Sequence, residues 1–297
     1  TREVAELVLL DSMGVLGKEA KRENKPTLYE EKDVFEAMRL WKDLTYHQKF
    51  EIEGAMGPII AEYYDSGHIL GSGIITFSYQ GKKIAFTGDL GNTPSPLMRD
   101  TEMIDDLDYL CIESVYGDRN HEDYDARIGL LKDAITSTIK AGGTLMIPAF
   151  SVERTQELLY YFNQLVEKGN IPLVPVYLDS PLAINVTAVY KKYESLFNVT
   201  ANSIIKSGDD IFNFKGLVMT KTPEESKSIN NVVGPKVIMA GSGMSNGGRI
   251  LHHEAKYLGD EKSTLLIVGY QAYGTLGRKL VDGAKEIMIH GMPVQVR

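Results

Sequence analysis

The stretch YYDSGHILGSGIITFSYQGKKIAFTGDLG, residues 63–91, predicts two β-strands joined by a tight turn. Apolar residues alternate with other residues through Ile75–Tyr79 and again through Ile84–Phe86, which is the period of a strand. The dipeptide Gln80-Gly81 between them has the composition of a two-residue hairpin turn. Such a turn pairs Tyr79 with Lys82, and this pairing sets the register of the whole hairpin.

The register brings two polar side chains to the open end of this hairpin. His68 lies near the start of the first strand, and Asp89 lies just past the end of the second. An imidazole and a carboxylate held together in glycine-rich loops suit a hard or borderline divalent metal. For an isolated pair, a structural histidine and a turn aspartate would be the simpler interpretation, so the surrounding sequence has to decide.

The segments GHILGS, residues 67–72, and FTGDLG, residues 86–91, resemble the metallo-β-lactamase superfamily, and in particular its β-CASP branch of RNA- and DNA-processing nucleases. The resemblance implies that His68 and Asp89 are metal ligands and that Asp89 is a catalytic residue that bridges two zinc ions. The segment ESVYGDR, residues 113–119, is similar to the family's ESTYGDR, with Val115 in place of threonine. The resemblance implies a catalytic role for Glu113, which would pair with an active-site histidine and assist proton transfer.

Composition and charge restrict the class of protein. The chain has 297 residues and a net charge of −8, which argues against binding nucleic acid through a bulk positive field but leaves a local basic groove open. The one cysteine, Cys111, lies in the apolar run 109–112, and we expect it to be buried in a strand. No disulfide framework is therefore expected, and no run approaches the roughly 20 apolar residues of a membrane span. We expect a cytoplasmic protein with no membrane partner.

The order of predicted elements changes near residue 119. Helices are expected over 1–24 and 31–44, and short strands near 50–52 and 59–64, before the hairpin and a buried strand at 108–113. From there helices alternate with strands, which indicates a parallel sheet with helices on its faces. The expected helices are 122–140, 151–168, 181–195, 201–212, 223–230, 247–258 and 275–281, and the expected strands are 144–148, 173–178, 217–220, 236–240 and 263–268. The tail, 286–289 and 294–296, is again predicted as strand.

The predicted fold class is therefore α/β with two domains. The resemblance implies that residues 1–118 and 282–297 form an incomplete metallo-β-lactamase-type αββα domain and that residues 119–281 form an inserted β-CASP domain with a parallel sheet. Two helix starts are well marked, by Ser180-Pro181 and by the capping box Thr222–Glu225.

The carboxyl ends of the inserted strands predict an anion site, because ligands of open parallel sheets bind there and helix N-termini attract phosphate. Any one of these loops could equally be ordinary loop chemistry, but several on one edge favour a phosphate- or RNA-binding cleft. The candidate residues are Ser151, Arg154, Asp179, Ser180, Ser242, Gly243, Met244, Gly247, Gly248 and Tyr270. A dinucleotide fingerprint is excluded, since Asn246 occupies a position that needs glycine.

The inserted segment also resembles the β-CASP domain of RNA-processing nucleases, including the nuclease of the cleavage and polyadenylation machinery. The matching segments are IPAFSVERTQELLYYF, residues 147–162, VYLDSPLA, residues 176–183, IMAGSGMSNGGRILHH, residues 238–253, and VGYQAYGTLGR, residues 268–278. The resemblance implies zinc-dependent hydrolysis of RNA phosphodiester bonds by two zinc ions, which would activate a bridging water and hold the attacking and leaving oxygens. RNA is the expected partner and DNA is the alternative. The sequence does not decide between endonuclease and exonuclease cleavage, nor whether the protein forms a homodimer.

One family feature is missing. No two of the six histidines are spaced i, i+2, so the family's H-x-H-x-D-H signature is absent from this sequence; they are His47, His68, His121, His252, His253 and His290. We therefore expect this chain alone to be an inactive part of a longer enzyme. His290 is left out of the metal site, and His252-His253 is expected on a helix surface or beside the phosphate site. The alternative is a degenerate, non-catalytic RNA-binding or scaffold member; a small-molecule hydrolase is disfavoured by the large insert.

Overall fold

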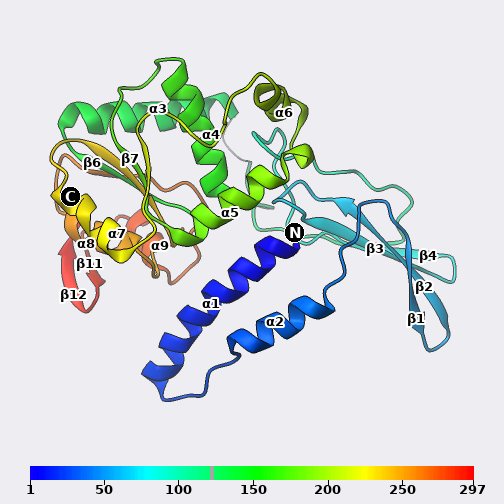
Figure 1. Ribbon diagram of the computed structural model, residues 1–297. Coiled ribbons are helices and arrows are strands. Elements are labelled where there is room, and N and C mark those ends of the chain that lie inside the picture. Colours follow the sequence, from blue (N-terminus) through cyan, green and yellow to red (C-terminus); the bar gives the residue numbers. More distant parts are fainter. Residues whose placement is uncertain (121–123) are drawn as a thin grey trace. The chain divides into compact units, whose positions relative to one another are not determined.

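The computed structural model describes residues 1–120 and 124–297, which form two compact units (Figure 1). The first unit comprises Thr1–His121 and Val189–Ser203, and the second comprises Glu122–Ala188 and Ile204–Arg297. Both combine helices with a β-sheet, which confirms the α/β class. Among the residues described, no helix is both long and apolar enough to span a membrane.

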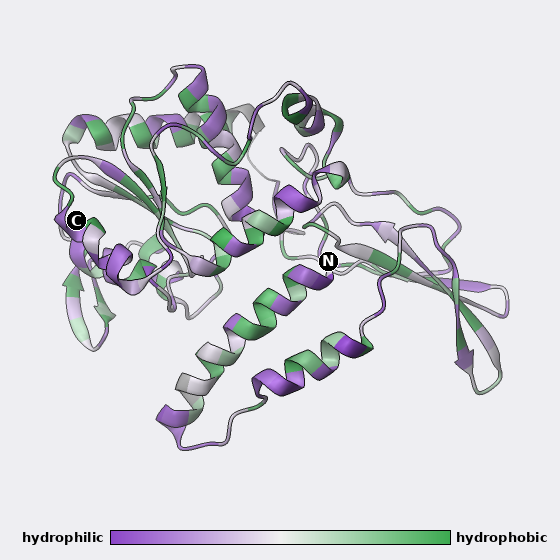
Figure 2. Ribbon diagram, in the orientation of Figure 1, coloured by the Kyte–Doolittle hydropathy of each residue, from purple (hydrophilic) through white to green (hydrophobic). Residues whose placement is uncertain are grey.

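The first unit begins with two helices, α1 (Arg2–Glu23) and α2 (Glu31–Leu40). The Thr1 hydroxyl caps α1 by accepting from the Val4 N–H, and Asn24 ends it in the left-handed conformation at φ 53°. Figure 2 shows hydrophobic and hydrophilic residues alternating along α1. Both predicted helices are confirmed, although α2 ends four residues before the expected position.

The sheet of the first unit has the strand order β1-β2-β3-β4-β5, with the first four strands antiparallel and β5 parallel to β4. The strands are β1 (Phe50–Gly54), β2 (Gly57–Asp65), β3 (Gly73–Tyr79), β4 (Lys82–Phe86) and β5 (Tyr109–Cys111). Tyr79 lies opposite Lys82, as the turn at Gln80-Gly81 requires. The predicted hairpin and its register are therefore correct.

The expectation of a buried strand at 108–113 is wrong. All three residues of β5 are exposed, and so is the free thiol of Cys111. The reason is position: β5 is the edge strand of its sheet, paired only with β4, and no described segment covers it. Apolar sequence shows that a strand can be buried, but its neighbours decide whether it is.

The sheet of the second unit is parallel, in the order β10-β6-β9-β7-β8. Its strands are β6 (Thr144–Pro148), β7 (Val176–Leu178), β8 (Leu217–Met219), β9 (Lys236–Ala240) and β10 (Thr264–Leu265). Every residue of β6 and β9 is buried, as expected of parallel strands covered on both faces. The late strand β9 lies between β6 and β7, so loops from distant parts of the sequence meet at the carboxyl edge.

The helices of the second sheet follow the predicted alternation (Figure 1). They are α3 (Tyr124–Ala141), α4 (Arg154–Glu167), α5 (Pro181–Lys192), α7 (Pro223–Ser228), α8 (Ile250–Tyr257) and α9 (Leu276–Val281), with a short 3₁₀ turn at Ile229–Asn231. The segment Val189–Ser203 of the first unit holds the end of α5, a 3₁₀ turn at Glu194–Leu196 and most of α6 (Val199–Lys206). Both marked helix starts are confirmed: the Ser180 hydroxyl accepts from the Ala183 N–H, and the capping box of Thr222 and Glu225 is formed. The predicted first residue of α3, Glu122, lies outside the described residues.

The tail forms the antiparallel hairpin β11 (Glu286–Ile289) and β12 (Met292–Gln295). Ile287 and Ile289 are buried in a cluster with Met146 of β6 and Ile250 of α8. In the structure the tail thus packs within the second unit. The assignment of 1–118 with 282–297 to one domain, and of 119–281 to the other, stays a prediction.

Candidate functional site

His68 and Asp89 meet at the open end of the β3–β4 hairpin. Their side chains approach to 3.7 Å between Nε2 and Oδ2 and are 41% and 72% exposed. The loops that carry them pack backbone against backbone: Gly91 N–H donates to the Ser66 carbonyl, and a Cβ on Gly91 would lie 2.1 Å from the Gly67 oxygen. Glycine at 91 is therefore what permits the close approach.

Glu113 lies beside the same loop. Its carboxylate accepts from the backbone N–H groups of Leu90, at 3.4 Å, and Val115, at 2.9 Å. The Glu113 N–H in turn donates to the Thr87 hydroxyl at 3.2 Å. The segment after β5 is thus tied to the segment after β4. Glu113 is held there by Leu90, the residue that follows Asp89 in the chain.

The first unit offers the right types of side chain for zinc, but too few of them. One imidazole nitrogen and one carboxylate are suitable ligands, whereas a structural zinc site normally has four. Within residues 1–120 and 124–297, no cluster of three or more His, Cys, Asp or Glu side chains could hold a metal. His68 and Asp89 by themselves are thus too few to complete a zinc site.

In the second unit, three loops meet at the carboxyl ends of adjacent strands. Ser151, after β6, and Ser180, after β7, lie on either side of Gly241, which follows the central strand β9; the two hydroxyl oxygens are 3.2 Å apart. We call the loops 149–151, 179–180 and 241–248 the strand-end rim. The structure thus brings together the hydroxyl groups that the sequence placed at this edge.

The glycine-rich loop of the rim, 241–248, closes on itself. The Ser242 N–H donates to the Gly247 carbonyl, and a Cβ on Gly248 would lie 2.2 Å from the Gly241 oxygen. Gly243 packs against Phe150, whose ring would lie 2.7 Å from an added Cβ. The glycines are needed for these contacts.

The loop is also held from outside. Gln271 Nε2 donates to the Gly243 carbonyl at 2.9 Å, and the Gly277 N–H donates to the Met244 carbonyl at 3.0 Å. The Met244 and Gly247 backbone is therefore anchored next to the segment that carries Tyr270, whose side chain is 42% exposed. Arg154, at the start of α4, pairs with Glu157 at 2.6 Å.

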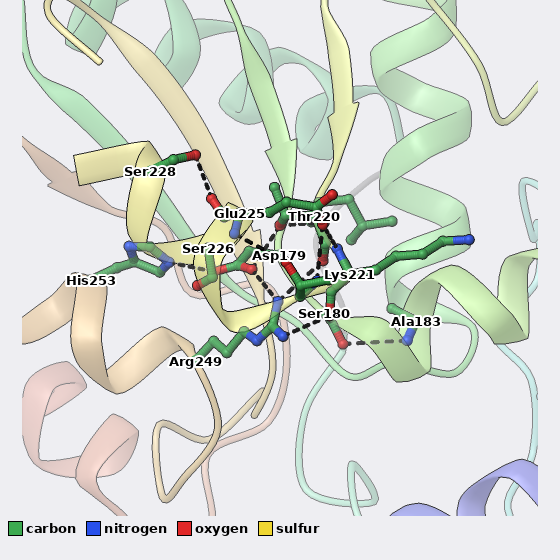
Figure 3. A network of polar contacts seen from close by, with 12 residues as sticks. Asp179, Ser180, Ala183, Thr220, Lys221, Glu225, Ser226, Ser228, Arg249 and His253 are labelled. Atoms are coloured by element: carbon green, nitrogen blue, oxygen red, sulfur yellow. Dashed lines mark hydrogen bonds and ion pairs between the residues drawn. The ribbon is translucent and has the colours of Figure 1, made fainter. Parts of the chain in front are cut away.

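Asp179 is the centre of a buried polar network at the rim (Figure 3). Its carboxylate is 0% exposed. Its oxygens accept from Thr220 Oγ1 (2.7 Å), Ser226 Oγ (2.6 Å), Arg249 Nη1 (2.7 Å) and His253 Nε2 (2.7 Å). Burial by itself would raise the pKa of Asp179, but these hydrogen bonds outweigh it and hold the pKa well below its usual range. The group is thus a buried anion with every contact supplied by protein.

Two further buried residues belong to this region. His253 is 1% exposed and bonded to Asp179, which excludes the helix-surface alternative and leaves the other expected position, beside the proposed phosphate site. Its spacing of four residues from Arg249, which places both on one face of α8, was the available signal. Glu254 is 0% exposed, and Ser245 Oγ donates to its Oε1 at 2.5 Å; burial raises the pKa of Glu254 to about 7. No pattern in the sequence marked Glu254.

Comparisons with known proteins show what this chain is similar to. The Beta-Casp domain matches residues 155–280. The chain is 32% identical over 293 residues to Ribonuclease TTHA0252 of Thermus thermophilus, covering 98% of this chain and 64% of the relative. It is 37% identical over 279 residues to an RNase J-like protein of Methanocaldococcus jannaschii, covering 92% and 63%. It is 29% identical over 296 residues to cleavage and polyadenylation specificity factor subunit 3-I of Arabidopsis thaliana, covering 97% and 40%. The chain thus spans less than two thirds of the length of each of these relatives.

Proposed function

Because the chain belongs to the β-CASP family of metallo-β-lactamase-fold RNA nucleases, we propose that the protein hydrolyses phosphodiester bonds of RNA in a zinc-dependent reaction. The observation that carries this proposal is the approach of His68 Nε2 to Asp89 Oδ2, at 3.7 Å, beside the fixed carboxylate of Glu113. A histidine, a bridging-type carboxylate and a second acid on adjoining loops are the groups that metal-assisted hydrolysis uses.

His68 and Asp89 are the proposed zinc ligands of this chain. Bound zinc would supply an activated water and stabilise negative charge on phosphate oxygens. Two donors do not complete a zinc site. Glu113, with its two oxygens oriented by the Leu90 and Val115 N–H groups, is proposed to hold a proton-transferring group in place.

The strand-end rim is proposed to bind RNA phosphate. Its support is chemical: the rim has hydroxyl groups at Ser151, Ser180 and Ser242, and a glycine-rich backbone that leads into α8. Asp179 differs from the other candidates, because a buried anion repels phosphate. Its proposed contribution is therefore indirect.

An assay with RNA labelled at either end tests the proposed function. We expect zinc-dependent cleavage by the full-length protein and none by Asp89→Ala, with Asp100→Ala, a change at another exposed aspartate, as the control. Fragment lengths separate endonuclease from exonuclease, and a DNA of the same sequence tests the alternative substrate. Cleavage retained in Asp89→Ala would rule out the assigned role of Asp89.

A non-catalytic RNA-binding or scaffold protein is the second candidate. It is favoured by one observation, that the described residues offer no third metal ligand beside His68 and Asp89. The same assay distinguishes the two, because a scaffold would bind the labelled RNA and leave it intact with zinc added.

A further inference from the structure

Arg249 joins three strand ends of the second unit. It is the residue immediately before α8, directly after the glycine-rich loop, and its side chain reaches the ends of β7 and β8 (Figure 3). Nη1 donates to Asp179 Oδ1 at 2.7 Å and to the Thr220 carbonyl at 3.1 Å, and Nη2 donates to the Lys221 carbonyl at 2.8 Å. The guanidinium plane is thus fixed by three acceptors.

These contacts leave part of the guanidinium unused. A guanidinium has five N–H donors, and three are engaged here. Over the described residues, neither the Nε N–H nor the second Nη2 N–H has an acceptor, and the side chain remains 20% exposed. Two unused donors on a planar cation are suited to a phosphate group, which accepts from arginine in a bidentate manner.

The groups behind Arg249 explain how it is held. Asp179 neutralises the charge of the guanidinium from the buried side, and His253 Nε2 donates to the other oxygen of the same carboxylate. Glu225 fixes the segment that supplies the carbonyl acceptors, since its carboxylate accepts from the Lys221 and Thr222 N–H groups at 2.6 and 2.9 Å. The guanidinium is therefore set in place before any ligand arrives, which lowers the entropy lost on binding.

We propose that Arg249 contacts an RNA phosphate through its unused N–H donors and that Asp179, supported by His253, is the positioning residue that holds it there. This inference rests on the proposed function, since it names the residue through which the strand-end rim grips the RNA backbone. It also gives Asp179 a role that its buried negative charge permits.

The affinity for RNA tests the contact with Arg249. Binding of a fluorescent single-stranded RNA to the full-length protein is measured by anisotropy, with a chelator present to prevent cleavage. Arg249→Lys keeps the net charge and an ion pair with Asp179 but removes the fork of donors. We expect about tenfold weaker binding and an unchanged slope of log affinity against log salt, because the substitution keeps the charge and changes only the geometry of the donors.

Arg278→Lys is the matched control, because Arg278 of α9 is exposed and paired with Asp282. It should change neither affinity nor slope. Arg249→Lys with the affinity of the unmodified protein would overturn the inference alone. No RNA binding by the unmodified protein would overturn the proposed function as well, so the two failures are distinguishable.

A double-mutant cycle tests the positioning role. Asp179→Asn should weaken RNA binding by itself but add nothing in the Arg249→Lys background, because Asp179 acts through Arg249. Ser226→Ala removes one donor to Asp179 without touching Arg249. It should weaken RNA binding less than Asp179→Asn does, and it too should add nothing in the Arg249→Lys background. Ser226→Ala takes the place of Asp179→Asn in the cycle if Asp179→Asn does not fold. Additive losses in both cycles would show a general structural role and overturn the assignment.

Discussion

The Ser245 hydroxyl donates to Glu254 Oε1 at 2.5 Å, and both side chains are fully buried. Ser245 belongs to the glycine-rich loop and adopts the left-handed conformation at φ 55°, while Glu254 lies on the helix that the loop leads into. Glu254 Oε2 has no partner among the described residues. A buried acid with only one hydrogen bond thus fixes the loop of the proposed phosphate site.

This relationship predicts that stability falls as the pH rises. Burial raises the pKa of Glu254 from 4.5 to about 7, so between these values the folded protein binds a proton that the unfolded chain has lost. Protonated Glu254 therefore makes its full contribution to the free energy of unfolding below pH 4.5. About 3 kcal/mol of that free energy is lost as the pH rises to 7. Urea unfolding at several pH values measures it.

Glu254→Gln should remove the fall in stability between pH 4.5 and 7. At pH 8 the variant should be more stable than the unmodified protein, because a neutral amide replaces a buried charge. Glu167→Gln, at an exposed position of α4, is the control and should match the unmodified protein. An unchanged pH profile in Glu254→Gln would contradict the prediction.

Zinc binding by the 297-residue chain is predicted to be weak. His68 and Asp89 supply two donors, and four are usual in a structural zinc site. Calorimetric titration should find no tight stoichiometric zinc, and the weak binding present should decrease further in His68→Ala. Tight zinc that survives dialysis would mean that further ligands exist in this chain.

Gly248 is predicted to tolerate substitution less well than Gly274. Both have positive φ, 74° and 86°, so alanine at either position costs about 1–2 kcal/mol of backbone strain. A Cβ on Gly248 would also meet the Gly241 oxygen at 2.2 Å, whereas nothing lies within 4 Å of one on Gly274. Denaturant unfolding should show the larger loss for Gly248→Ala, and equal losses would mean that the loop is not closed as described.

Cys111 is predicted to react in the folded protein. Its thiol is exposed on the edge strand β5. A thiol reagent such as Ellman's should label one group per chain without denaturant, at a rate similar to that after unfolding. Labelling that occurs only after unfolding would restore the expectation of a buried strand.

Local sequence was enough to predict several parts of this protein. Gln80-Gly81 determined the hairpin and the pairing of Tyr79 with Lys82, because a two-residue turn leaves one register. Ser180-Pro181 and Thr222–Glu225 marked helix starts through contacts made within four residues. Alternation of helices and strands predicted a parallel sheet, and the carboxyl ends of its strands located the rim.

Contacts between residues that are far apart in the sequence could not be predicted from local sequence. The sequence offered no sign that β9 lies between β6 and β7, and only this order places Gly241 between Ser151 and Ser180. Nor did it show that Cys111 is exposed, since burial depends on which elements cover a strand.

What the amino-acid sequence determined by itself were the features made by neighbours in the chain: the turn, the caps, the strand and helix periods, and the approach of His68 to Asp89 through one hairpin. Only the tertiary structure decided that Asp179 faces inward to Arg249 and His253. The physical reason is separation along the chain. These three side chains meet because β7 and β9 pair and α8 packs on their sheet, and burial then makes the charge of Asp179 require its four donors.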